Sequence, residues 1–178
     1  MAYTTIKKPT DYFNTVTFTG TGSSQQITTG LNMSANGGMV WNKLRDGANN
    51  NIVWDTIRTA TESIYPDLTA AEATEATSLT AFTTTGWTGG GGGNTSNNGS
   101  TYVSWNWLAG SSHSGSSNSD GDVNSTVSVN TTAGFSIVKF NTNGQSGTFT
   151  VGHGLGAVPK MMILKPLPTT DAWWTYHT

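Results

Sequence analysis

Cysteine is absent from this 178-residue chain, so disulfide bonds and thiolate chemistry are excluded. Charge is scarce as well, because Asp, Glu, Lys and Arg make up 10% of the residues against a usual share of about a quarter. The eight Lys and Arg residues form no basic stripe, which argues against nucleic acid as a partner. There is no run of about 18 apolar residues, so the sequence predicts no membrane insertion.

The patterns that usually carry catalysis or metal binding are also missing. The histidines, His113, His153 and His177, have no metal-ligand spacing to one another. The glycine run at residues 89–93 is not followed by the lysine that a phosphate-binding loop needs. The acidic residues are scattered, without the convergent pair that a glycosidase requires. We therefore predict no catalytic residues, no metal site and no cofactor, in a protein that is not an enzyme.

The residues that are abundant favour β-structure. Thr, Ser, Asn and Gly take the place of charge, and aromatic residues reach 10%, with seven Trp among them. Thr, Val, Tyr and Trp suit pleated surfaces, while Gly and Asn suit turns, so the composition is typical of an all-β protein.

Several stretches have the pattern of strands. Threonines alternate with Val16 and Phe18, which indicates a half-buried strand. In the strand predicted over residues 101–108, Trp105 and Trp107 lie on one face with Val103, which we expect to be the core face. Further strands are expected at residues 26–28, 39–41, 52–54, 135–140 and 161–164, and the last of these, a continuous apolar run, predicts burial on both faces.

One short stretch has a helix signal. Thr69 followed by Glu72 forms a capping box, in which each side chain can satisfy a free amide at the helix start. Alanines follow at four of the next positions and favour helix, so we expect the one short helix over residues 69–76. Glu72 and Glu75 are then expected on its solvated face.

The chain repeats part of itself. Residues 135–140 resemble residues 13–18, an offset of 135 − 13 = 122. The same offset aligns two further pairs of stretches, 39–43 with 161–165 and 52–54 with 174–176. Self-similarity of this kind predicts one complete unit followed by the first third of another. The alternative is that two Gly- and Thr-rich stretches look alike through composition alone.

These observations divide the chain into four segments. Residues 1–12 are predicted to be an N-terminal docking arm, and residues 13–110 the first β-sandwich repeat. Residues 111–134 are predicted to be a Gly/Ser-rich linker with a leading strand, and residues 135–178 the first, incomplete part of a second sandwich repeat. The residues expected to anchor the arm to a larger surface are Tyr3, Ile6, Pro9, Tyr12 and Phe13.

Trp87 and Trp173 are candidate glycan-contact residues. A Trp ring offers a flat apolar face and a polar edge, which suits stacking on a pyranose ring. Trp87 lies beside the glycine-rich loop and is expected to be exposed. Trp173 and Trp174 point to opposite faces if they lie on a strand, so we expect one of them to be buried. The alternative for each of these rings is core packing.

Several longer motifs resemble one known family. They are KPTDYFNT and FTGTGSSQ within residues 8–25, DTIR at 55–58, TAAE at 69–72, YVSWNWLAG at 102–110, NTTAGFSIV at 130–138 and GHGLG at 152–156. Together they are similar to the repeated domain of tail-fibre-like virion structural proteins from marine tailed phages of the cyanophage type. The resemblance implies a concanavalin-like jelly-roll β-sandwich with one short helix, followed by the start of a second tandem sandwich. It supplies no catalytic residues.

The resemblance also implies a function as a phage virion structural protein, in a tail fibre or a similar appendage. The N-terminal end is expected to attach to tail, baseplate, portal-adaptor or capsid proteins, and distal repeats to contact a host surface glycan or receptor. Assembly in the host cytoplasm and release by lysis would place the protein in the virion. A homotrimer is expected, since side-by-side β-units cover strand edges. The alternatives are a capsid decoration or head-fibre protein and a glycan-binding, lectin-like module.

The last segment is not expected to fold alone. A sandwich cannot bury its core with its first strands only, so residues 161–178 need a complement. We expect either that the natural chain continues past Thr178, which we favour, or that a neighbouring chain completes these strands.

Overall fold

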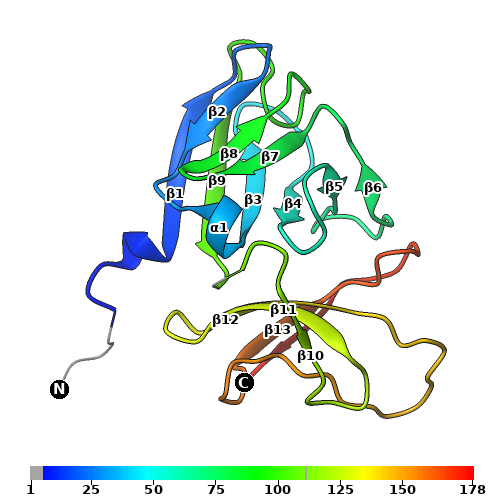
Figure 1. The fold of residues 1–178 in the computed structure, drawn as a ribbon. Helices are drawn as coiled ribbons and strands as arrows, with labels where there is room; N and C mark the ends of the chain where they lie inside the picture. Colours follow the sequence, from blue (N-terminus) through cyan, green and yellow to red (C-terminus); the bar gives the residue numbers. More distant parts are fainter. Residues whose placement is uncertain (1–5, 111) are drawn as a thin grey trace.

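Several antiparallel sheets make up the protein, which we describe from a computed structural model covering residues 6–110 and 112–178 (Figure 1). Strands account for 40% of the residues and helix for 4%, so the prediction of an all-β protein is confirmed, and the arrangement is consistent with a β-sandwich. The sheets lie in two groups, which we call the first unit (residues 8–109) and the second unit (residues 112–178).

The first unit contains two main sheets. The four-stranded sheet has the order β1 (Phe13–Thr19), β9 (Thr101–Leu108), β3 (Gly38–Leu44) and β4 (Ile52–Asp55). The three-stranded sheet has the order β2 (Gln25–Thr28), β8 (Gly86–Gly89) and β7 (Leu79–Thr83). The smaller elements are the 3-10 helix η1 (Pro9–Asp11), the α-helix α1 (Met33–Asn36) and the paired strands β5 (Glu62–Ser63) and β6 (Ala73–Thr74).

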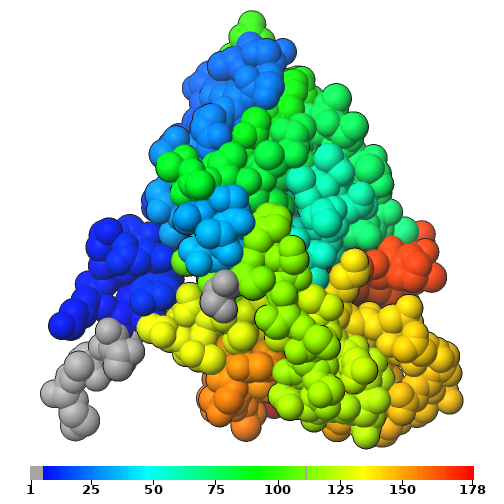
Figure 2. Space-filling view, in the orientation of Figure 1, coloured from blue at the N-terminus to red at the C-terminus, as the bar shows by residue number. Residues whose placement is uncertain are grey.

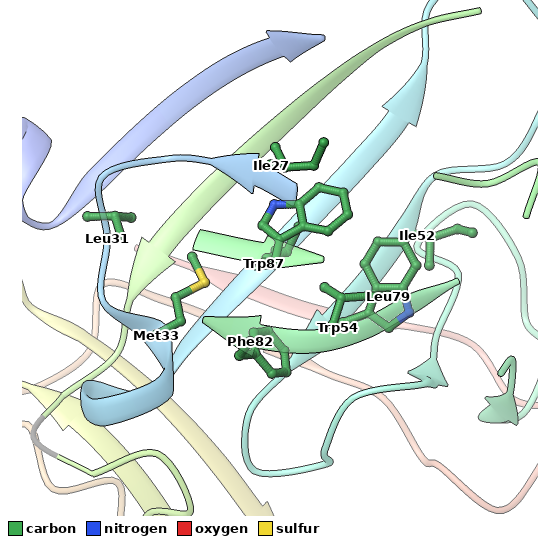
Figure 3. Close-up of a cluster of buried hydrophobic side chains, with 9 residues drawn as sticks. Ile27, Leu31, Met33, Ile52, Trp54, Leu79, Phe82 and Trp87 are labelled. Atoms are coloured by element: carbon green, nitrogen blue, oxygen red, sulfur yellow. The ribbon is translucent and has the colours of Figure 1, made fainter. Parts of the chain in front are cut away.

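The core of the first unit lies between these two sheets (Figure 3). Both sheets contribute apolar side chains that are at most 9% exposed, and helix α1 and the segment before it add two more. These residues are Ile27, Leu31, Met33, Val40, Ile52, Trp54, Leu79, Phe82 and Trp87. Burial of such side chains contributes about 2 kcal/mol each, so this cluster is the main source of stability of the unit.

The face of the central strand β9 that lies against the core is the opposite of the one predicted. Tyr102, Ser104 and Asn106 are fully buried, while Trp105 and Trp107 lie outward and are half-buried. The prediction that the Trp face is the core face is therefore wrong. A buried hydrogen bond explains the choice, because Trp87 Nε1 on the opposite sheet donates to Asn106 Oδ1 at 3.1 Å.

Asn106 is also satisfied on its other side. Its Nδ2 donates to the backbone oxygen of Asn14 at 3.0 Å and to Ser104 Oγ at 3.0 Å. A buried amide group whose hydrogen bonds are all formed costs little free energy of folding, whereas an unpaired one costs much more. Alternation of residues along a strand carries no information about such partners, which come from other strands.

The helix predicted over residues 69–76 does not form. Ala73 and Thr74 pair instead with Glu62 and Ser63 as β5 and β6. Glu72, expected to complete the capping box, accepts a hydrogen bond from Arg58 at 2.9 Å. These tertiary contacts outweigh the local preference of alanine for helix. Within the described residues the one α-helix is α1, which follows the N-cap Asn32, whose side chain accepts from the Ala35 amide.

The second unit has one three-stranded and one two-stranded sheet. The first has the order β10 (Ser116–Asn118), β11 (Ser125–Asn130) and β12 (Phe135–Phe140). The second is the hairpin of β13 (Met161–Leu164) and β14 (Trp174–His177), which we call the β13–β14 ribbon. Strand β10 lies within the segment predicted as a linker, where its backbone pairs with β11 despite its Gly- and Ser-rich surroundings.

The β13–β14 ribbon repeats the β3–β4 hairpin in register. Met39 pairs with Asp55 in the first unit and Met161 with His177 in the second, and 161 − 39 = 177 − 55 = 122. The flanking bonds match too, since the Thr56 amide donates to the Gly38 carbonyl and the Thr178 amide to the Lys160 carbonyl, each at 3.1 Å. Strand β12 begins at the same offset from β1. The 122-residue repeat is therefore structural as well as sequential at the hairpin, whereas β12 pairs with β11 and, among the described residues, has no counterpart of the β1–β9 pairing.

The prediction that residues 161–164 are buried on both faces is wrong for this structure. Their side chains are between 46% and 55% exposed. Among the described residues, β13 has β14 as its only strand neighbour, and no second layer covers the ribbon. A run of apolar residues indicates that a strand favours burial, but it does not identify the segment that would bury it.

Replacing Asn106 by Leu should destabilise the first unit. The substitution keeps the approximate volume of the side chain but leaves the buried Trp87 indole N–H without its acceptor. Leaving buried polar groups unpaired costs about 1–3 kcal/mol. Urea denaturation followed by Trp fluorescence should show this loss, whereas Asn50→Leu on the exposed β3–β4 loop should leave the midpoint nearly unchanged. Equal midpoints for the two variants would contradict the assignment.

Candidate functional site

The outer face of the four-stranded sheet carries a row of aromatic side chains. We call Phe13, Trp41, Trp105 and Trp107 the outer aromatic row. Trp105 pairs directly with Trp41 across β9 and β3, and Trp107 pairs with Phe13 across β9 and β1. Direct cross-strand partners share one face of a sheet, so all four rings lie on the side away from the core. Each of them is half-buried.

The two ends of the row have different environments. At one end Phe135 of the second unit stacks on Trp107, with ring centroids 6.1 Å apart, and Phe13 packs against the same indole at 4.9 Å. At the other end Trp41 and Trp105 meet edge to face at 6.5 Å. The first end is therefore part of the contact between the units, and the second end is the part of the row that can receive a ligand or a partner.

Trp41 is held in place by its own polar edge. Its Nε1 donates to Asn51 Oδ1 at 3.0 Å, and Asn51 is fixed in turn because its amide donates to Asp67 Oδ2 at 3.0 Å. A ring that is oriented in this way loses little freedom on stacking against a sugar or an apolar side chain. Sequence reasoning missed this site because it assigned the Trp face of β9 to the core.

Trp87, predicted as an exposed glycan contact, is fully buried at 0% exposure. It lies between the two sheets, with its ring near Trp54 and Phe18 and its N–H bonded to Asn106. That prediction is wrong. The glycine-rich loop beside Trp87 does not expose the ring, because the side chain lies on the core face of β8, within the buried apolar cluster.

Trp173, the second glycan candidate, is half-buried and joins the two units. Its Nε1 donates to the backbone oxygens of Tyr65 at 2.9 Å and Leu68 at 3.1 Å. Backbone bonds between residues 69–72 and 167–171 reinforce the contact. In the space-filling view the red loop before β14 lies against the teal and green part of the first unit (Figure 2). The polar edge of Trp173 is thus already used within the chain.

The residues predicted to dock the N-terminal arm lie in different environments. Tyr3 is outside the described residues. Ile6 and Tyr12 are half-buried, and Pro9 is exposed at the start of η1. Phe13 opens β1 and packs on Trp107, so it belongs to the outer aromatic row. Residues 6–8 extend away from the sheets (Figure 1).

Two carboxylates predicted to lie on a solvated helix face are instead engaged in polar networks. Glu72 binds Arg58, which is 6% exposed and also forms an ion pair with Asp55. Glu75 accepts hydrogen bonds from Ser63 Oγ and from the Tyr65 hydroxyl. Burial, together with this carboxylate, raises the pKa of Tyr65 above its usual range. These networks fix the segment that Trp173 contacts.

Two kinds of feature are absent from the described part of the chain. Across residues 6–110 and 112–178, no group of three or more His, Cys, Asp or Glu side chains is arranged to hold a metal ion. Over those same residues, no helix is long and apolar enough to span a membrane.

The fold and the outer aromatic row define an all-β, sandwich-like protein with an aromatic outer face. Residues 8–178 match the family described as "Domain of unknown function (DUF7483)", and the chain belongs to that family. The match extends over both units. Neither the curated proteins nor the solved structures contain a match to the chain.

Trp173→Phe should loosen the contact between the units without unfolding either of them. The variant keeps the ring but removes the N–H that bonds to the carbonyls of Tyr65 and Leu68. Amide hydrogen exchange at Glu72 and Asp171, which are bonded across the contact, should accelerate about fivefold. Trp174→Phe is the matched control, because Trp174 is 63% exposed. Equal exchange in both variants would show that Trp173 does not hold the contact.

Proposed function

We propose that the protein is a structural component of a phage virion, in a tail fibre or a similar appendage. The sequence motifs that resemble tail-fibre-like virion proteins motivate the proposal. The observation that carries it is the recurrence of the β3–β4 hairpin as the β13–β14 ribbon at an offset of 122 residues and in the same register. Tandem copies of one β-unit are a direct way to build an elongated structure.

In this proposal each unit is a concanavalin-like jelly-roll sandwich, and β12, β13 and β14 are the first strands of the second one. The N-terminal segment attaches to tail, baseplate, portal-adaptor or capsid proteins, with Pro9 exposed and Ile6 and Tyr12 half-buried. Three chains lie side by side as a homotrimer, which covers strand edges that would otherwise aggregate. The distal repeats contact the host surface. No catalytic role is proposed.

Purified virions provide the test. We expect mass spectrometry of gradient-purified particles to find the polypeptide at the copy number of a tail component. Antibody labelling in electron micrographs should place it on the tail or on fibres, with the N-terminal end proximal. Labelling spread over the head lattice at the copy number of a capsid protein would favour the decoration-protein alternative. Absence of the polypeptide from purified virions would contradict both.

A glycan-binding module is the second candidate, and the Trp41–Trp105 end of the outer aromatic row favours it. Two half-buried indoles at 6.5 Å present apolar ring surface beside a polar edge, which is the chemistry that pyranose rings bind. This end of the row takes over from Trp87 as the candidate glycan contact, because Trp87 is buried.

Trp41→Ala should weaken binding of the protein to host surface polysaccharide by about three- to tenfold, the worth of one aromatic stacking contact. Glycan arrays followed by calorimetry would measure this loss. Trp174→Ala, which removes an exposed indole from the second unit, should leave the affinity unchanged. A blank array for the unmodified protein, or equal affinity for Trp41→Ala, would remove this candidate.

A further inference from the structure

The β13–β14 ribbon exposes positions that are buried in its counterpart. Tyr176 is 50% exposed, although the equivalent Trp54 (176 − 122) is 0% exposed. Met162 is 49% exposed against 0% for the equivalent Val40. Single exposed apolar residues are ordinary, but a contiguous exposed set on two paired strands marks an interaction surface.

The edge of the ribbon is open on a defined side. In a strand, the N–H and C=O of one residue point to the same side, and successive residues alternate. Since the Lys160 carbonyl accepts from Thr178, which directly follows β14, residues 160, 162 and 164 direct their backbone groups toward β14. Met161 and Ile163 therefore direct theirs to the other side, where β13 has no strand neighbour among the described residues.

The first unit shows what occupies that side of the same hairpin. There the Gly38 carbonyl accepts from Thr56, so Met39 and Trp41 direct their backbone groups away from β4. Strand β9 lies on this side, with Trp107 opposite Met39 and Trp105 opposite Trp41. It is eight residues long and antiparallel to β3. Its outward indoles also shield the neighbouring strand, as the contact between Trp41 and Trp105 shows.

We propose that the free edge of β13 binds an extended strand of the β9 type, in the place that β9 takes on β3. The strand alternates aromatic residues with small polar ones, as Thr101–Leu108 does. Within the described residues, β9 itself has this pattern and is held between β1 and β3, so it is not free to move. Main-chain hydrogen bonds to Met161 and Ile163 would give affinity, and aromatic side chains over these two residues would give specificity.

A second copy of this chain is a weaker occupant. Its own open edge is β13, a strand of four residues whose side chains are Met, Ile and Leu. Pairing two such edges would join the ribbons but would add no aromatic cover to faces that are already apolar. A strand of the β9 type satisfies the same backbone groups and covers the outward side chains as well.

Two proline variants of the full chain separate this edge from the rest of the ribbon. Ile163→Pro removes an N–H that points to the free edge of β13 and leaves the bonds to β14 in place. Thr175→Pro is the matched control: Thr175 is the counterpart of Val53 (175 − 122), whose amide points away from β3 and donates to Ile64. Proline is tolerated at strand positions whose N–H faces solvent, so the β13–β14 ribbon should persist in both variants.

The probe is a labelled peptide with the sequence of residues 101–108 and a lysine tag for solubility. Fluorescence anisotropy should show that it binds the unmodified chain and the Thr175→Pro variant alike, and the Ile163→Pro variant about tenfold or more weakly. A peptide of the same composition in scrambled order is the control for sequence. Its affinity for the unmodified chain should be no higher than the affinity of the probe for the Ile163→Pro variant. Binding lost equally in both variants, lost in neither, or absent from the unmodified chain would overturn the proposal.

Two further measurements keep the result decisive. Adding the probe to the unmodified chain should slow amide exchange at Met161 and Ile163, and unchanged exchange at both would overturn the proposal even if Ile163→Pro fails to fold. Light scattering of the chain alone should show no association that depends on Ile163. A dimer that Ile163→Pro abolishes would identify a second copy as the occupant and contradict the proposal.

Discussion

The buried hydrogen bond between Trp87 and Asn106 is the interaction on which the arrangement of the first unit depends. It joins the middle strand of the three-stranded sheet to β9 of the four-stranded sheet. It also decides which face of β9 is inward, since a buried indole N–H needs an acceptor. With Asn106 inside, Trp105 and Trp107 lie outside. Trp107 can then stack on Phe135, and Trp105 can meet Trp41. One polar contact in the core thus sets the surface through which the two units touch and the one available to a ligand.

The positions of several strands and the repeat were predictable from the sequence, but strands β7 and β8 and the direction of the side chains were not. The alternation of residue types predicts a strand over residues 101–108, but it does not tell which of the two faces is buried. That depends on the hydrogen-bond partners of Asn106, which come from other strands. The 122-residue offset predicts the register of the β13–β14 ribbon, because paired strands with equal spacing repeat the same ladder. The prediction of a helix over residues 69–76 was wrong. The buried Arg58 forms an ion pair with Glu72, and the two residues that follow pair with β5. Contacts between distant segments decided each of these outcomes.

The second unit is anchored at two places and open at a third. Phe135 on Trp107 and Trp173 on the Tyr65 and Leu68 carbonyls fix it to the first unit. In the part of the chain that the structure describes, its β13–β14 ribbon, in contrast, has the hairpin of the first unit without the strand and the layer that cover it there. The same local sequence pattern therefore gives a buried hairpin in one context and an exposed one in the other. The difference lies in the neighbours, and an exposed strand edge of this kind is a site for pairing with a further strand.

Amide hydrogen exchange along β3 and β13 of the free chain tests this account most directly. If the ribbon copies the hairpin and lacks a counterpart of β9, Met162 and Leu164 should be protected while Met161 and Ile163 exchange rapidly. The equivalent Met39 and Trp41 should be protected, because they face β9. Protection of Met161 and Ile163 comparable to that of Met39 and Trp41 would contradict the account, since it would mean that the edge of β13 is already occupied.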